Sequence, residues 1–300
     1  MFAGEGKPAA RFLPVTIFIL TAAVLSFDAR AELDQRVHSD GGLKIAATIF
    51  PLVDIGKHIA GKETEIVTIL PAGANPHTFE LAPHEVRELE KVQIVFMIGR
   101  GFDDWVRAIG ESLPEIKILA VDGGINLIGT QDDDPHYWLS IANAKIIARN
   151  MALALIELDP DRKSVYQANL ESYVAELEKA DEMIKQMLLS LPTRKIITFH
   201  DGWRYFARDY GLEILGNVES SQGSEPTPRS LARLQETARQ HQIKVLFSEP
   251  AVSKEVAKSL AQDLGLFLYE LDPIGTSSAQ SYLDLMMKNA RVIHEALTHE

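Results

Sequence analysis

Short apolar runs alternate with longer amphipathic segments along most of the chain. The apolar runs resemble buried strands and lie at residues 44–49, 65–70, 94–99, 117–122, 195–199, 212–215, 245–248 and 266–271. The segments between them have helical spacing and predict helices at residues 52–60, 84–91, 103–112, 142–158, 203–210, 230–241, 254–264 and 282–297. Such alternation is typical of an α/β fold. We therefore expect two lobes, each with a four-stranded, mostly parallel sheet flanked by helices.

One helical segment, residues 159–191, is much longer than the others. Apolar residues recur along it at alternating steps of four and three: Tyr166, Leu170, Tyr173, Leu177, Ala180, Ile184, Met187 and Leu191. This spacing places one apolar stripe on a single helix of about 45 Å, long enough to run beside two lobes. Asp159 is expected to cap its start and Pro160 to take the first helical position. A coiled coil is the alternative, but a strand is predicted soon after Pro192.

The long helix divides the chain into parts of similar architecture. We expect an N-terminal lobe at residues 32–158, the linking helix at 159–191 and a C-terminal lobe at 192–300. A sequence of 300 residues with 46% apolar content can fill two separate cores. Residues 216–228, rich in Ser, Gly, Glu and Pro, are expected to form a long surface loop.

Residues 1–31 have the pattern of an export signal. Lys7 and Arg11 precede an apolar run at residues 12–25, and the residues ending at Ala31 fit a small-x-small cleavage site. A membrane anchor is the alternative, but the run is shorter than the roughly 20 residues that span a bilayer. The sequence contains no cysteine, so it offers no thiolate ligand and no cysteine for lipid attachment. We expect a freely soluble periplasmic protein whose signal peptide is removed.

The charge of the chain limits the partners it can bind. The formal net charge is -12, which argues against a surface for nucleic acid and is compatible with binding cations.

Four side chains of the kind that bind metals follow predicted strands. His77 and His136 lie in the loops after the second and fourth strands. His200 and Asp272 come directly after the fifth and eighth strands. Ligand sites of open parallel sheets lie beyond the carboxyl ends of the strands, so these residues are candidates for one site. Three imidazoles and one carboxylate suit Zn²⁺, with Mn²⁺ and Fe²⁺ as weaker fits. With ordinary pKa values near 6.5, these histidines would lose metal below about pH 6.

The segments around these residues carry a family resemblance. Residues 76–80 read Pro-His-Thr-Phe-Glu, and residues 134–140 read Asp-Pro-His-Tyr-Trp-Leu-Ser. Residues 199–201 read Phe-His-Asp, and residues 271–275 read Leu-Asp-Pro-Ile-Gly. With these motifs in this order, the chain resembles the zinc and manganese solute-binding proteins of ABC importers, the ZnuA/TroA-like class.

The resemblance implies a function as well as a fold. It implies two lobes joined by a rigid helix and metal ligands at His77, His136, His200 and Asp272. It also implies delivery of the ion to an ABC permease and its ATPase in the inner membrane, and we expect the receptor to be a monomer.

The third ligand position indicates which metal is bound. Zinc members of this class carry a histidine there and manganese members a glutamate, so His200 indicates Zn²⁺, with Mn²⁺ or iron as the alternative. Many zinc members also have a histidine-rich loop before the second ligand. Here residues 129–135 are short and acidic instead, which weakens the indication without reversing it.

Glu249, at the end of the seventh predicted strand, has two possible roles. It can orient a ligand histidine, or it can cap the helix that follows. A metal-dependent hydrolase with Glu249 as base is an alternative function. Four protein ligands would leave no open position on the metal, so we expect a carrier and not an enzyme. An adhesin on the same scaffold is a further alternative, and the lack of a lipidation cysteine argues against it.

Overall fold

The computed structural model describes residues 43–61, 64–71, 73–129, 133–219, 226–276 and 279–298. Residues 43–300 belong to one compact unit. The predicted export signal at residues 1–31 lies outside the described residues. No helix among the described residues combines the length and apolar character needed to cross a membrane.

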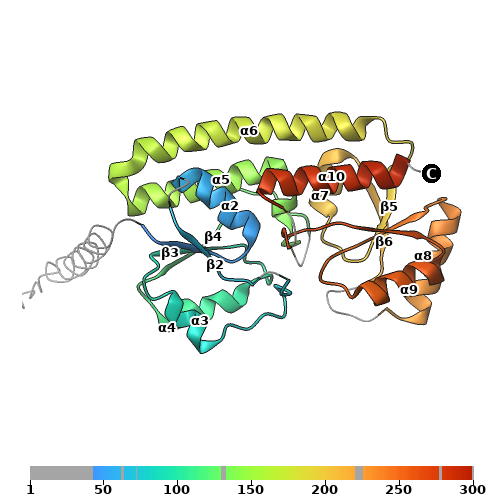
Figure 1. The fold of residues 1–300 in the computed structure, drawn as a ribbon, viewed down its shortest axis with the longest axis horizontal. Helices are drawn as coiled ribbons and strands as arrows, with labels where there is room; N and C mark the ends of the chain where they lie inside the picture. The colour runs from blue at the N-terminus through green and yellow to red at the C-terminus, as the bar shows by residue number, and fades with distance from the viewer. Residues whose placement is uncertain are drawn as a thin grey trace, which may run out of the picture. The chain divides into compact units, whose positions relative to one another are not determined.

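The N-terminal lobe contains one parallel sheet with strand order β2-β1-β3-β4. Its strands are β1 (Ile45–Ala47), β2 (Ile66–Thr68), β3 (Ile94–Met97) and β4 (Lys117–Ala120). Its helices are α2 (Phe50–Ala60), α3 (Pro83–Glu88), α4 (Arg107–Ser112) and α5 (Ile141–Leu158). The central strands β1 and β3 are buried throughout, which explains their continuous apolar runs. In Figure 1, α2 and α5 cover one face of this sheet, and α3 and α4 lie on the other.

The C-terminal lobe repeats this arrangement with strand order β6-β5-β7-β8, again all parallel. Its strands are β5 (Lys195–Thr198), β6 (Glu213–Asn217), β7 (Val245–Ser248) and β8 (Phe267–Glu270). Its helices are α7 (Arg204–Tyr210), α8 (Pro228–Gln240), α9 (Lys254–Leu264) and α10 (Tyr282–Thr298). Each lobe has its own cluster of buried apolar side chains. The predicted α/β fold of two four-stranded lobes is confirmed.

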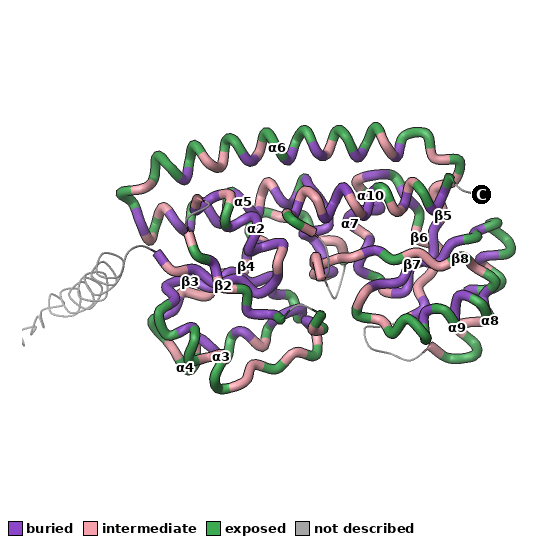
Figure 2. The backbone as a smooth tube through the Cα atoms, in the orientation of Figure 1, coloured by how far each residue is buried: buried purple, intermediate pink, exposed green. Residues whose placement is uncertain are grey.

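The linking helix, α6 (Lys163–Leu189), passes along both lobes (Figure 1). It contacts α2 and α5 of the N-terminal lobe and α7 and α10 of the C-terminal lobe. Its buried side chains are Tyr166, Tyr173, Leu177, Ala180, Ile184 and Leu188. Figure 2 shows these buried positions alternating with exposed ones along the helix. Five of the eight predicted stripe positions are buried, whereas Leu170 is only half-buried and Leu191 lies beyond the end of the helix. Near that end Leu188 is buried in place of Met187, because the stripe follows the helical period of 3.6 residues.

The start of the long helix differs from the prediction. Pro160–Arg162 forms a separate 3-10 turn, and α6 begins only at Lys163. Asp159 caps neither element with its side chain. Instead its buried carboxylate accepts a hydrogen bond from the Tyr166 hydroxyl at 2.8 Å. The predicted cap was wrong because the buried hydroxyl of Tyr166, seven residues further along, competes for the carboxylate.

The packing of α2 and the length of β6 complete the fold. His58 of α2 stacks on Tyr173 of α6 with ring centroids 4.2 Å apart. Strand β6 continues to Asn217, so it takes the first two residues of the loop predicted at residues 216–228. Residues 220–225 of that loop lie outside the described residues.

The segment between β8 and α10 is bound to the N-terminal lobe by hydrogen bonds. The Tyr282 backbone N–H donates to Asp54 of α2 at 2.8 Å, and the Tyr282 hydroxyl donates to the Trp138 carbonyl at 2.6 Å. The Trp138 indole donates to the Pro273 carbonyl at 2.8 Å. The segment that carries Asp272 is therefore hydrogen-bonded to the N-terminal lobe at Pro273 and at Tyr282.

Candidate metal centre

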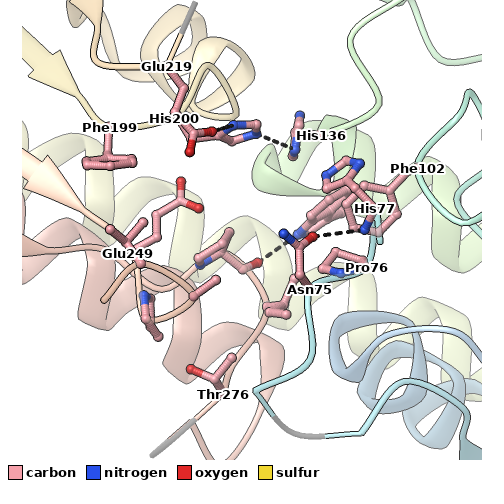
Figure 3. Close-up of a pocket in the computed structure, with 16 residues that line it drawn as sticks. Asn75, Pro76, His77, Phe102, His136, Phe199, His200, Glu219, Glu249 and Thr276 are labelled. Atoms are coloured by element: carbon pink, nitrogen blue, oxygen red, sulfur yellow. Dashed lines mark hydrogen bonds and ion pairs between the residues drawn. The ribbon is translucent and has the colours of Figure 1, made fainter. Parts of the chain in front are cut away.

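Three of the four predicted ligands meet between the lobes. His77, His136 and His200 offer ring nitrogens that all lie within 4.8 Å of one another. His77 lies in a turn after β2, His136 directly precedes a 3-10 turn (Tyr137–Leu139), and His200 follows β5. The N-terminal lobe thus supplies two imidazoles and the C-terminal lobe one. Figure 3 shows the three rings converging on one space.

The rings of His136 and His200 approach each other through their Nε2 atoms, with their planes at 71°. The Nε2 atoms of His136 and His200 are 3.1 Å apart. Two nitrogens bound to one Zn²⁺ at ~2.0–2.1 Å with tetrahedral angles would be about 3.3–3.4 Å apart. The observed separation is therefore close to that of two ligands of a single ion.

His77 is placed by the loop around it. Its backbone N–H donates to the Asn75 side chain at 3.0 Å, and the Trp105 indole donates to the Pro76 carbonyl at 2.9 Å. The imidazole meets the Phe102 ring edge to face, at an interplanar angle of 84°. An Asx turn and two aromatic side chains thus fix the direction of this ring.

His136 has a carboxylate partner that the sequence alone did not reveal. One oxygen of Asp134 accepts from the His136 backbone N–H at 3.0 Å and lies 2.8 Å from the ring Nδ1. The Tyr205 hydroxyl, from the C-terminal lobe, donates to the Asp134 carbonyl at 2.8 Å. The sequence shows Asp134 as one of several loop acids, and only its position two residues before a histidine could have indicated this contact.

His200 also has a carboxylate on the Nδ1 side. The Glu219 carboxylate approaches this atom to 3.9 Å and lines the same pocket. Glu219 lies just beyond β6, the position that the rule for parallel sheets favours. The sequence pattern does not single out Glu219, because it falls in the predicted surface loop.

A glycine permits the two lobes to approach here. A Cβ atom on Gly202 would lie 3.0 Å from the His200 ring and 3.1 Å from the His136 ring. The pocket around the histidines encloses about 100 Å³ and includes apolar walls from Phe102, Trp138 and Phe199.

Burial keeps two of the imidazoles uncharged. Desolvation, with the neighbouring imidazoles, lowers the pKa of His77 to about 2. The same causes lower the pKa of His200 to about 3. A neutral imidazole presents a free lone pair, which is the form that binds metals.

Asp272 is not part of the histidine group. Its carboxylate accepts from the backbone N–H groups of Ile274, Gly275 and Thr276 at 2.8–3.1 Å. It also accepts from the Thr276 hydroxyl at 3.3 Å. The carboxylate is therefore hydrogen-bonded to the loop that follows it, and its role as a fourth ligand stays a prediction.

Glu249 projects into the pocket and is buried. Its carboxylate accepts from the Trp203 indole at 2.9 Å, and burial raises its pKa to about 7. It does not cap α9, because the Ser253 hydroxyl does so. The capping role was wrong, and an orienting role towards a ligand histidine stays a prediction.

These features define a class of protein: two α/β lobes on a common helix, with a cluster of three imidazoles between them. The family model for the zinc-uptake complex component A, periplasmic (ZnuA), matches residues 45–296. The chain belongs to this family. Its description is that of a transport component and not of an enzyme.

Individual relatives agree with this assignment. The manganese-binding lipoprotein MntA of Halalkalibacterium halodurans is 27% identical over 90% of this chain and 94% of its own. The manganese ABC transporter substrate-binding lipoprotein PsaA of Streptococcus mitis is 30% identical over 94% of this chain and 98% of its own. A zinc-bound crystal structure of a ZnuA deletion mutant has a TM-score of 0.79 and 30% identity, and the match covers 86% of this chain and 99% of that one.

These relatives contradict one expectation. MntA and PsaA are both named lipoproteins, whereas we expected a protein without a lipid anchor. The lack of cysteine in this sequence therefore does not decide how the protein is retained, and we withdraw that expectation. The argument against an adhesin, which rested on it, is withdrawn too. A location outside the cytoplasm agrees with the description of the family.

Proposed function

We propose that this protein is an extracytoplasmic receptor that captures Zn²⁺ and delivers it to the permease of an ABC importer. The observation that carries the proposal is the convergence of His77, His136 and His200 within 4.8 Å between two lobes. Two of these rings have pKa values far below neutral, so they are ready to bind an ion without first losing protons. The function agrees with the family description and with the metal-transport names of the relatives.

Asp272 is our proposed fourth ligand. It follows β8 at the carboxyl edge of the sheet, where the parallel-sheet rule places ligands. A carboxylate has about four acceptor sites, and the loop at residues 274–276 now occupies them. To bind the ion, Asp272 would have to exchange at least one of these hydrogen bonds for the metal.

Zinc is favoured over manganese by the chemistry of the donors. Three nitrogens and one oxygen suit a tetrahedral Zn²⁺ site, whereas Mn²⁺ prefers more oxygen ligands. The proteins similar to this chain include a zinc-bound ZnuA and relatives named for manganese. Manganese is therefore the alternative cargo.

The mechanism we propose is binding and release without catalysis. Four protein ligands would leave no position on the ion for an activated water, and this separates a carrier site from a hydrolase site. The carrier would act as a monomer with a permease and an ATPase as its partners. We further propose that residues 32–158 and 192–300 act as its two lobes and residues 159–191 as the link between them.

Calorimetric titration of the metal-free protein tests the proposal. Wild-type protein should bind one Zn²⁺ per chain, and the single variants His77→Ala, His136→Ala and His200→Ala should each bind far more weakly. His241→Ala is the matched control, because His241 is an exposed histidine at the end of α8. Unchanged affinity in the three pocket variants would refute the proposed site.

A further inference from the structure

His136 and His200 share a feature that metal binding by itself does not explain: a carboxylate lies beside each ring. Each has a carboxylate of its own lobe on the Nδ1 side, Asp134 for His136 and Glu219 for His200. Each directs its Nε2 at the other ring, 3.1 Å away. We infer that Asp134 and Glu219 are positioning residues, which hold Nε2 of His136 and His200 towards the ion. This inference rests on the proposed function.

The contact of Asp134 with His136 is the stronger of the two. A single carboxylate oxygen is bonded to the backbone N–H of His136 and to its ring Nδ1, at 3.0 and 2.8 Å. An ionised carboxylate accepts hydrogen bonds only, so it selects the tautomer with the proton on Nδ1. The lone pair then remains on Nε2, inside the pocket. In the other tautomer an N–H would point at the ion.

The second oxygen of Asp134 supports a role in charge balance. This atom is buried and has no hydrogen-bond partner among the described residues, and the Asp134 side chain is 4% exposed. The Arg204 guanidinium is the nearest cation that the structure records for it, at 3.9 Å. A buried carboxylate with an unmade hydrogen bond is costly unless positive charge lies nearby. A divalent ion bound to Nε2 of His136 would place positive charge on the opposite side of that ring from Asp134.

Glu219 stands in the corresponding place on the other lobe. Its backbone N–H donates to the Phe199 carbonyl at 2.9 Å, and the Val218 N–H donates to the Thr198 carbonyl at 3.1 Å. These bonds extend the pairing of β5 with β6, so Glu219 and His200 lie side by side (Figure 3). The distance of 3.9 Å is that of an ion pair and longer than a hydrogen bond. We therefore expect Glu219 to contribute less than Asp134.

Two measurements test the inference, and the first can decide it in the wild-type protein alone. Nitrogen-15 NMR of the histidine rings in the metal-free wild-type protein should show His136 with its proton on Nδ1. In Asp134→Asn the side-chain amide can donate to Nδ1 of His136 as well as accept from it. The tautomer of His136 with its proton on Nε2 should therefore appear. A wild-type His136 that already carries its proton on Nε2 would overturn the role of Asp134, even if the variant failed to fold.

The second measurement is the dissociation constant for Zn²⁺. We expect it to rise about 10- to 100-fold in Asp134→Asn and about tenfold in Glu219→Gln, the range found for partners of metal-binding histidines. Asp133→Asn and Glu213→Gln remove the same charge outside the pocket and should change the dissociation constant less than twofold. Asp133 pairs with Arg100, and Glu213 is exposed at the start of β6.

The outcomes separate the inference from the function it rests on. If Asp134→Asn and Glu219→Gln bind Zn²⁺ like their controls while His136→Ala and His200→Ala do not bind, the inference is wrong and the receptor function stands. If the histidine variants also bind like the wild type, the proposed function itself fails.

Discussion

At the scale of single residues, the site depends on partners that no local pattern shows. His77, His136 and His200 could be chosen from the sequence because each follows a predicted strand. Asp134 and Glu219 could not, because their contacts depend on how a loop turns and how two strands pair. Sequence position identifies residues at the sheet edge, but only the fold shows which of them touch.

The lowered pKa values change the expected behaviour in acid. At pH 5 the rings of His77 and His200 should still be neutral in the folded, metal-free protein. Protons should compete with metal at these two rings only below about pH 4, and not below pH 6 as ordinary pKa values would imply. Ring resonances followed by NMR should show no titration of either histidine between pH 8 and 5. A midpoint between pH 6 and 7 for both would contradict this.

The same shifts predict how acid affects stability. The unfolded chain binds protons at both rings near pH 6.5, whereas the folded chain does not bind them until about pH 3. The free energy of unfolding of the metal-free protein should therefore fall as the pH drops from about 6.5 to 3, by up to about 1.4 kcal/mol per pH unit for each ring. Double substitution of His77 and His200 by Gln should remove this part of the slope.

The choice of metal is tested at His200. His200→Glu replaces a borderline nitrogen with a hard oxygen, so it should cost more affinity for Zn²⁺ than for Mn²⁺. The new carboxylate would also lie near Glu219, and a divalent ion would relieve their repulsion. The measurement is the ratio of the two dissociation constants, with His241→Glu as the control. An unchanged ratio would place His200 outside the coordination shell.

At the scale of elements, the strands and most helices follow from hydrophobic pattern, but the start of α6 does not. The apolar stripe correctly predicts that one helix links the lobes. It does not reveal that Asp159 is buried and bonded to Tyr166, because that contact depends on how α5 and α6 pack. Local capping rules fail where a tertiary contact offers the cap residue a better partner.

Two tyrosines of α6 give a matched test of this junction. Tyr166→Phe removes the donor to a buried carboxylate, a bond to a charged group worth about 1.5–3 kcal/mol, so the melting temperature should fall by several degrees. Tyr173→Phe removes a buried hydroxyl that has no hydrogen-bond partner among the described residues. It should leave stability unchanged or raise it slightly. Equal losses in the two variants would contradict the account of the Asp159 contact.

At the scale of the whole molecule, the two lobes are joined by more than the long helix. The segment after β8 is hydrogen-bonded to Trp138 and Asp54, and Tyr205 of the C-terminal lobe holds the loop of Asp134. With the lobes connected at several points, we expect metal uptake to involve a local exchange of the hydrogen bonds of the Asp272 carboxylate and not a wide opening of the lobes. These connections join residues more than 70 positions apart in sequence, so pattern alone could not predict them.

Gly275 tests the contact between this loop and the N-terminal lobe. Its φ is +77°, and a Cβ atom there would lie 2.5 Å from the Phe50 ring. Gly101 has a φ of +79° and no atom within 4 Å of such a Cβ. Gly275→Ala should therefore lower the melting temperature more than Gly101→Ala, although the backbone strain of about 1–2 kcal/mol is common to both. It should also weaken Zn²⁺ binding, and equal effects would show that the loop is not packed against Phe50.

The most direct test of the receptor function is to locate the ion. Crystals of the metal-free protein soaked in Zn²⁺ should give one strong anomalous peak at the zinc edge. We predict that it lies about 2.0–2.1 Å from one ring nitrogen each of His77, His136 and His200, with Asp272 turned towards it as the fourth ligand. A peak outside the pocket, or one bound by fewer than two of these histidines, would contradict the account.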